Sequence, residues 1–254
     1  MITLCVPTRG RPDHFARMVD SALATAHSAA DLQVVYYVAD NDPRRDDYPP
    51  RSTTWKAGGV DGLIRLDGPH HWNTVVWNRC VRAGAGPIFM QAADDLVFRT
   101  LGWDKLIIEA FDRSDDKLIM VHCADGSPND RPTRIEWRYA DGTTRTSYNP
   151  FAAHVILHRN WIDVVGYLVP EWFPSTFCDM WVNELADRLD RRVFLPDVLV
   201  EHLHPSWRKR EPDATDELRE RSDRTYEPGR VFVERSWQRE QDFVELRKAI
   251  EASA

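Results

Sequence analysis

The first hundred residues alternate between short, mostly apolar segments and longer segments whose apolar positions have helical spacing. Residues 2–6 form a mostly apolar run that predicts a buried strand, and the segment 7–12, with its Pro, Gly and Arg residues, ends it. In residues 13–26, apolar side chains recur along one face of a helix. A buried strand, a loop and an amphipathic helix therefore open the chain.

The same order of elements continues along the chain. Residues 32–39 and 62–66 predict strands, residues 73–83 a helix, and residues 87–92 a buried strand. Strands and helices that alternate at this spacing are typical of a doubly wound, mostly parallel sheet. Further on we expect a helix at 103–111, a strand at 118–122, a hairpin within 126–148, helices at 157–165 and 179–190, and an extended segment at 193–203.

The last part of the chain has a different character. From residue 211 onward the sequence is highly charged, and residues 234–252 carry apolar side chains on a charged background. This pattern predicts an amphipathic helix that packs on the body or on a partner. We therefore expect a main domain of residues 1–210 and a charged helical extension of residues 211–254.

Composition narrows the class of protein. The 254 residues are enough for one large α/β domain, and four widely separated cysteines lack the paired short spacing of a zinc site. With a net charge of -7 and interspersed charges, the chain as a whole has no electrostatic reason to bind nucleic acid or an anionic membrane. No signal peptide and no apolar segment of about 18 residues is visible, so we expect a cytoplasmic protein without a membrane span.

Polar side chains that could bind a ligand or take part in catalysis follow several of the expected strands. Asp40 follows the second strand, Asp94 and Asp95 follow the strand at 87–92, and His202 and His204 end the extended segment. Open α/β sheets bind ligands at the carboxyl ends of their parallel strands. We therefore expect these side chains to meet at one edge of the sheet, although each aspartate alone also suits a turn.

Metal binding is one chemistry that these residues could carry. Asp94 and Asp95 can hold a hard divalent cation, or they form a polar turn or helix cap after a core strand. His202 and His204 point the same way in an extended segment, so one or both could join the metal site, or both are structural. Because the candidate ligands are mainly oxygen atoms, magnesium or manganese fits better than zinc.

Phosphate binding and proton transfer have their own candidates. Arg9 and Arg11 could contact a diphosphate through charge-assisted hydrogen bonds, or they are solvated surface residues. Asp40 could accept hydrogen bonds from a nucleobase or a ribose. Asp179 lies at the start of the helix expected at 179–190, where it could cap the helix, act as a general base, or do both.

Residues 1–205 as a whole resemble a family 2-type glycosyltransferase of the GT-A fold. The opening strand and loop at 2–12, the acidic turn at 38–42, and the helix at 73–86 that leads into the strand at 88–95 are similar to that family's motifs. The resemblance implies a Rossmann-like, mostly parallel central sheet flanked by helices, with a C-terminal helical extension. It also implies a nucleotide-sugar half at about 1–100 and an acceptor half at about 101–210.

The resemblance implies roles for individual residues. Ala93 occupies the first position of the family's Asp-x-Asp motif, so Asp95 is the implied metal ligand and ribose recognition falls to Asp94. Asp179 is similar to the acceptor-side base of inverting members. His204, with His202, resembles a late histidine that some GT-A enzymes add to the metal shell. The residues implied to bind the donor nucleotide are Pro7, Thr8, Arg9, Arg11 and Asp40.

The function that the resemblance implies is metal-dependent, inverting transfer of a sugar from a nucleotide-sugar to a hydroxyl group. The cofactor would be Mn²⁺ or Mg²⁺, and uridine diphosphate is the family's commonest nucleotide. A non-catalytic nucleotide- or carbohydrate-binding module of the same fold is the alternative. A sugar-phosphate nucleotidylyltransferase fits less well, because the opening loop lacks a glycine-rich, lysine-bearing phosphate cradle.

The acceptor stays open between a saccharide, a protein side chain and a modified DNA base. A basic patch with an aromatic residue at 207–210 suits an anionic acceptor, although such a patch is also typical of a solvated loop. Aromatic residues near an acceptor suit sugar or base stacking. The residues that lie where the family shapes its acceptor pocket are His154, Trp161, Glu171, Trp172 and Phe173.

Overall fold

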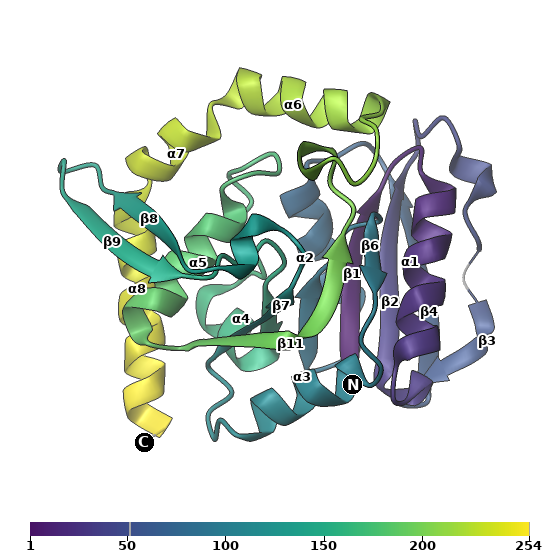
Figure 1. Cartoon of the computed structure of the whole chain (residues 1–254), viewed down its shortest axis with the longest axis horizontal. Helices are drawn as coiled ribbons and strands as arrows, with labels where there is room; N and C mark the ends of the chain where they lie inside the picture. Colours follow the sequence, from purple (N-terminus) through teal and green to yellow (C-terminus); the bar gives the residue numbers. More distant parts are fainter. Residues whose placement is uncertain (51, 254) are drawn as a thin grey trace.

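The computed structural model describes residues 1–50 and 52–253, which form a nine-stranded sheet with helices on both faces (Figure 1). The strand order is β3-β4-β2-β1-β5-β10-β7-β11-β6, and β8 and β9 form a separate hairpin. The strands are β1 (Ile2–Thr8), β2 (Leu32–Ala39), β3 (Ser52–Ala57), β4 (Val60–Gly68), β5 (Ile88–Gln91), β6 (Leu96–Phe98), β7 (Met120–Ala124), β8 (Thr133–Arg138), β9 (Thr144–Asn149), β10 (Ile156–His158) and β11 (Arg192–His202).

α-Helices connect β1 to β2, β4 to β5, β6 to β7 and β10 to β11. The α-helices are α1 (Pro12–Thr25), α2 (Asn73–Ala83), α3 (Trp103–Asp112), α4 (Arg159–Val165), α5 (Cys178–Leu189), α6 (Ala214–Tyr226), α7 (Pro228–Glu234) and α8 (Ser236–Ser253). None of the helices in the described residues combines the length and the apolar character needed to cross a membrane.

Most of the central strands are parallel, as the alternating pattern predicts, in the two groups β4-β2-β1-β5 and β7-β11 on either side of β10. β1 pairs in parallel with β2 and β5, β2 with β4, and β7 with β11. All eight residues of β2 are buried, because helices and loops cover both faces of the sheet. The parallel strands therefore end at one edge of the sheet, where their following loops can form a common site.

Several segments differ from the sequence-based expectation. Residues 157–165 were expected to be a single helix, but β10 (Ile156–His158) precedes α4 and lies antiparallel between β5 and β7. A three-residue strand is too short for its period to be distinguished from helical spacing. The strands β3 and β6 were also not expected from the sequence, whereas α6 and α7 lie in the helical extension expected at 211–254, although their bounds were not predicted.

The two faces of the sheet hold separate apolar cores. The core on one face contains Phe15 of α1 and Trp103 of α3, together with the side chains of β1 and β2 that point to that face. The core on the other face includes side chains from α2, α4, α5 and α8. Alternate residues of each strand thus enter opposite cores, which fixes the register of the central strands.

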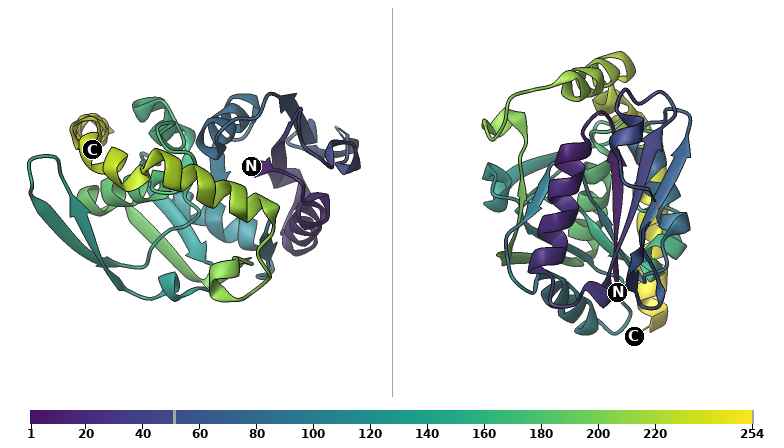
Figure 2. Two further views of the ribbon diagram at one scale, coloured as in Figure 1. Left: turned by 90° about the horizontal axis from the view of Figure 1, so that it is seen from above. Right: turned by 90° about the vertical axis from the view of Figure 1, so that its right-hand side faces the viewer.

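The C-terminal segment is divided between the body and the edge where the strands end. The expected helix at 234–252 is α8, which packs on α4 and α5. A fully buried ion pair between Arg239 of α8 and Glu184 of α5 reinforces this contact. In contrast, α6 lies across the top of the molecule in the view of Figure 1, above the carboxyl ends of the parallel strands, as Figure 2 also shows.

Candidate active site

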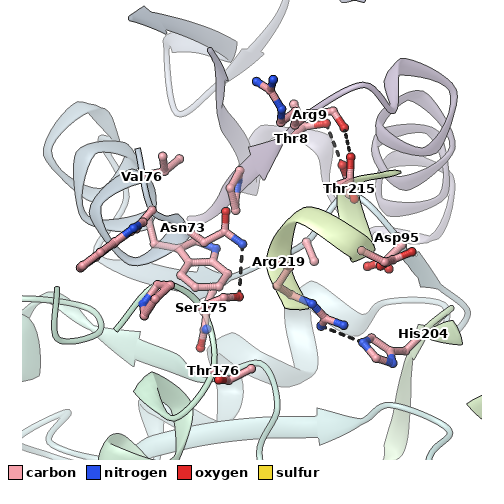
Figure 3. A pocket seen from close by; sticks show the side chains of 18 of the residues that line it. Thr8, Arg9, Asn73, Val76, Asp95, Ser175, Thr176, His204, Thr215 and Arg219 are labelled. Atoms are coloured by element: carbon pink, nitrogen blue, oxygen red, sulfur yellow. Dashed lines mark hydrogen bonds between the residues drawn. The ribbon is translucent and has the colours of Figure 1, made fainter. Parts of the chain in front are cut away.

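A cavity of about 310 Å³ lies at the carboxyl ends of the parallel strands. The last residues of four strands line it, namely Thr8 of β1, Ala39 of β2, Gln91 of β5 and His202 of β11. Side chains from the start of α5 and from α6 close its other sides (Figure 3). The sequence-predicted site residues in this lining are Pro7, Thr8, Arg9, Arg11, Asp94, Asp95, Asp179, His202 and His204.

Asp40 lies outside the lining of this cavity. Its side chain is exposed, and its nearest charged partner is Arg45, whose Nη2 is 3.7 Å from the carboxylate. The acid that supports the site from this turn is Asp42, whose carboxylate accepts a hydrogen bond of 2.8 Å from the backbone N–H of Gly10. Gly10 has a φ of +66°, a conformation that glycine adopts without strain.

The Asp94 carboxylate holds the opening loop in place. It accepts a hydrogen bond of 2.8 Å from the hydroxyl of Thr8, and Nη1 of Arg11 lies 3.4 Å away. Burial raises the pKa of Asp94 above its ordinary value, and the neighbouring Asp95 adds to this effect while Arg11 opposes it. Asp94 therefore contacts two of the residues predicted to bind the nucleotide.

Asp95 lies between a histidine and an arginine. β11 pairs with β6 so that His202 lies opposite Leu96, which brings His202 Nε2 to 3.2 Å from the Asp95 carboxylate. On the other side, Nη2 of Arg210 is 3.0 Å from the same carboxylate. Although burial acts to raise the pKa of Asp95, these two partners hold it well below its usual range.

The predicted metal ligands are only partly brought together. Among the described residues, no group of three or more His, Cys, Asp or Glu side chains is arranged to hold a metal ion. Asp95 and His202 are in contact, but the Nε2 atom of His204 faces Arg219 at 2.8 Å. Magnesium is usually held by one or two carboxylates together with substrate phosphates, and imidazole nitrogen suits transition metals better. Asp95 and His202 fit such a shared site, and His204 does not in this arrangement.

Asp179 lies on the cavity wall in the first turn of α5. The helix begins at Cys178 with Phe177 as its capping residue, so the predicted capping role of Asp179 is wrong. The Asp179 carboxylate accepts a hydrogen bond of 2.8 Å from the N–H of Met180. Burial raises its pKa to about 7, and the charge of Asp223 acts in the same direction. A carboxylate with such a pKa can accept a proton near neutral pH.

Helix α6 supplies site residues that the sequence analysis missed. Asp213 caps this helix, and its carboxylate also holds Arg11 at 2.6 Å. The hydroxyl of Thr215 donates to the backbone oxygen of Arg9 at 2.8 Å. The Asp213 and Asp216 capping box was the one sequence signal for a helix start here. The α6 residues that line the cavity are Thr215, Asp216, Leu218, Arg219 and Ser222.

The predicted acceptor residues are mostly placed elsewhere. Trp161 and Phe173 are buried in the apolar core, and of the predicted group only His154 lines the cavity. Trp72, which precedes α2, lines the cavity instead and contacts the ring of Tyr226 at the end of α6. An aromatic side chain at the cavity wall thus comes from a different loop than expected.

The basic segment at 207–210 is not an open cationic patch. Arg210 is paired with Asp95 and with Asp216, the latter at 2.5 Å. Lys209 is paired with Glu201 at 3.3 Å. Most of the positive charge in this segment is therefore matched by carboxylates, which weakens the case for an anionic acceptor at this position.

The comparisons with known proteins concern the fold. No protein-family model matches the chain, and no curated protein matches it by sequence. Among solved structures, the mannosyltransferase PcManGT from Pyrobaculum calidifontis in complex with GDP-Man and Mn²⁺ is similar, with a TM-score of 0.54 and 12% identity over 79% of this chain and 56% of that chain.

TarS from S. aureus is similar to the same extent. The structure of its residues 1–349 in complex with UDP has a TM-score of 0.52 and 13% identity, over 78% of this chain and 59% of that chain. The chain thus spans a little over half the length of these structures. Its mixed α/β architecture, with a large, mostly parallel central sheet flanked by helices, is that of GT-A glycosyltransferases, as the sequence resemblance implies.

Proposed function

We propose that this chain, which has the GT-A glycosyltransferase fold, transfers a sugar from a nucleotide-sugar donor to an acceptor hydroxyl group. The observation that carries the proposal is the meeting of Asp94, Asp95 and Asp179 in one cavity at the carboxyl ends of the parallel strands. This is the edge of an open α/β sheet where ligands bind. A cavity that combines carboxylates, arginines and an aromatic wall suits a diphosphate and a sugar.

The donor half of the cavity lies around β1, the β5–β6 turn and β11. We propose a uridine diphosphate sugar as the first candidate donor; TarS has been seen with UDP, and PcManGT with GDP-Man, so guanosine diphosphate sugars belong in the same test. Thr8 and Arg11, both tied to Asp94, position the opening loop. Asp94 acts in this proposal by orienting that loop beside the nucleotide.

The diphosphate gains negative charge as it leaves, and nearby positive charge stabilises it. Asp95 and His202 would hold Mn²⁺ or Mg²⁺, which would supply charge neutralisation for the leaving group when it is bound together with the donor. Arg9 is a further cation beside the cavity; its guanidinium donates to Asn41 at 2.7 Å, and among the described residues no carboxylate pairs with it. Arg9 is thus able to contact a phosphate oxygen without first leaving a carboxylate.

Asp179 is the proposed general base. It would take the proton of an acceptor hydroxyl as that oxygen attacks the anomeric carbon, while the bond from this carbon to the diphosphate oxygen breaks. Attack from the side opposite the leaving group inverts the configuration at the anomeric carbon. Since Asp179 contributes through its ionised form, its raised pKa keeps it basic enough to accept the proton near neutral pH.

This assignment predicts the pH dependence of the reaction. Asp179 is protonated and inactive below its pKa of about 7 and ionised above it. We therefore expect kcat to fall roughly tenfold for each pH unit below that pKa and to level off above it. Initial rates between about pH 5.5 and 8.5, with a thermal melt at each pH to confirm folding, measure this. A profile that is flat across this range contradicts the assignment.

Metal removal tests the function and the metal site together. Release of nucleoside diphosphate from a panel of nucleotide-sugars should be detectable with Mn²⁺ and should fall about 100-fold or more in excess EDTA, because a bound metal supplies several kcal/mol. An undiminished rate in EDTA would exclude the metal but not the transferase. Saturable binding of a donor without any release would instead support a non-catalytic binding module.

A further inference from the structure

Arg9, Arg11 and Arg219 line the cavity, and Arg210 lies beside it against Asp95; their electrostatic surroundings differ. Arg11 is within 3.4 Å of Asp94 and is also paired with Asp213 and Asp216. Arg210 is paired with Asp95 and Asp216. The positive charges of Arg11 and Arg210 are therefore already matched by carboxylates, and a phosphate group would have to displace one of them.

Arg219 on α6 has no such carboxylate. It follows the buried Asp216 by three residues, which places both on the cavity-facing side of the helix. Across the described residues, no carboxylate oxygen lies within 4.0 Å of its guanidinium, and its buried Nε atom has no hydrogen-bond partner. Figure 3 shows Arg219 extending from α6 into the cavity toward His204. The Nε–H donor of Arg219 thus lacks an acceptor in the part of the chain that the structure describes, and no carboxylate there pairs with the guanidinium at this distance.

The contact with His204 does not satisfy the hydrogen-bonding capacity of the Arg219 guanidinium. The Nε2 atom of His204 is 2.8 Å from Nη1 of Arg219, and its Nδ1 atom accepts from the backbone N–H of Ser206 at 3.2 Å. An imidazole offers at most one acceptor nitrogen, so it can accept from only one of these two donors. If the N–H of Ser206 donates to Nδ1, the proton of the His204 ring is on Nε2, and this N–H group and that of Arg219 face each other. An anionic oxygen at this point would accept from both.

We propose that Arg219 binds the diphosphate of the donor and stabilises it as the leaving group. This inference rests on the proposed function and names the residue that binds the phosphates in the same site. A guanidinium presents N–H donors in a planar fork that matches two phosphate oxygens. Its charge acts at the oxygen that becomes negative as the glycosidic bond breaks, which lowers the barrier to transfer. Helix α6 is thus part of the donor site.

The test compares Arg219→Ala with Arg219→Lys and with Arg221→Ala. Arg221 lies two residues further along the same helix and is exposed, so its loss controls for the general charge of α6. Calorimetric titrations with UDP or GDP, whichever the wild type binds, and with the matching nucleoside separate phosphate contacts from base contacts. Thermal melts of each variant confirm folding.

We expect Arg219→Ala to weaken nucleoside diphosphate binding about 10- to 100-fold, as hydrogen bonds to charged groups contribute, and to leave nucleoside binding within about twofold. Arg219→Lys should lie between the wild type and the alanine variant, and Arg221→Ala should match the wild type. Unchanged diphosphate affinity in Arg219→Ala would overturn the inference while leaving the proposed function intact. An equal loss for the nucleoside would also overturn it, and a wild type that binds no nucleotide would refute both.

Discussion

Replacing Asp179 with Asn is expected to lower sugar transfer about 10²- to 10⁴-fold, the usual contribution of a general base. Asn has the same shape and can still accept the hydrogen bond from the N–H of Met180. It cannot accept a proton from an acceptor hydroxyl. Because Asp179 does not contact the donor in this account, the affinity for nucleoside diphosphate should stay within about twofold. Initial transfer rates and calorimetric titrations measure the two effects separately.

Asp223→Asn is the matched control for this experiment. Asp223 lies on α6 outside the cavity lining, and burial also raises its pKa. Its removal should change the transfer rate less than threefold or so, since it makes no proposed contact with the substrates. Its charge also raises the pKa of Asp179, so the acid limb of the rate profile should move to lower pH in this variant. Wild-type turnover in Asp179→Asn would refute the base assignment.

The second large effect concerns the buried ion pair between Glu184 and Arg239. Both side chains are fully buried, and the guanidinium of Arg239 also stacks on Phe232 with its centre 3.9 Å from the ring. Glu184→Gln leaves a buried guanidinium without a carboxylate, which we expect to lower the free energy of unfolding by about 3–5 kcal/mol. Urea unfolding followed by tryptophan fluorescence measures this change.

Glu240→Gln provides the control for Glu184→Gln. Glu240 pairs with Arg188 at 2.6 Å but is half exposed, so its loss should cost less than about 1 kcal/mol. The double variant Glu184→Leu with Arg239→Met replaces the pair by apolar side chains and should recover most of the lost stability. Equal stability of Glu184→Gln and Glu240→Gln would show that the buried pair does not anchor α8 to α5.

The central fold could be predicted because its signals are local and strong. Strands buried on both faces, such as Leu32–Ala39, show as nearly continuous apolar runs, and α2 begins and ends where the sequence predicts. β10 could not be predicted, because its three residues take their strand conformation from pairing with β5 and β7. Such a short strand depends on contacts that are distant in sequence.

The site residues that directly follow strands could be predicted from the sequence. Those on α6, which lies over the strand ends, could not. Asp95, Asp179 and His202 line one cavity because chain reversal brings strand ends and the start of α5 together. Asp40 follows a strand as well, but the chain turns its side chain toward solvent. Arg219 belongs to a polar helix whose pattern is typical of a solvated surface, and only the tertiary structure places it over the strand ends.

The most direct test of the central claim is a crystal structure of the chain with a nucleoside diphosphate and Mn²⁺. We predict that the nucleotide occupies the cavity at the strand ends, with its diphosphate between Asp95 and Arg219 and with Asp179 facing the space left for the sugar. A nucleotide bound outside this cavity, or a diphosphate with no contact to either Asp95 or Arg219, would contradict it.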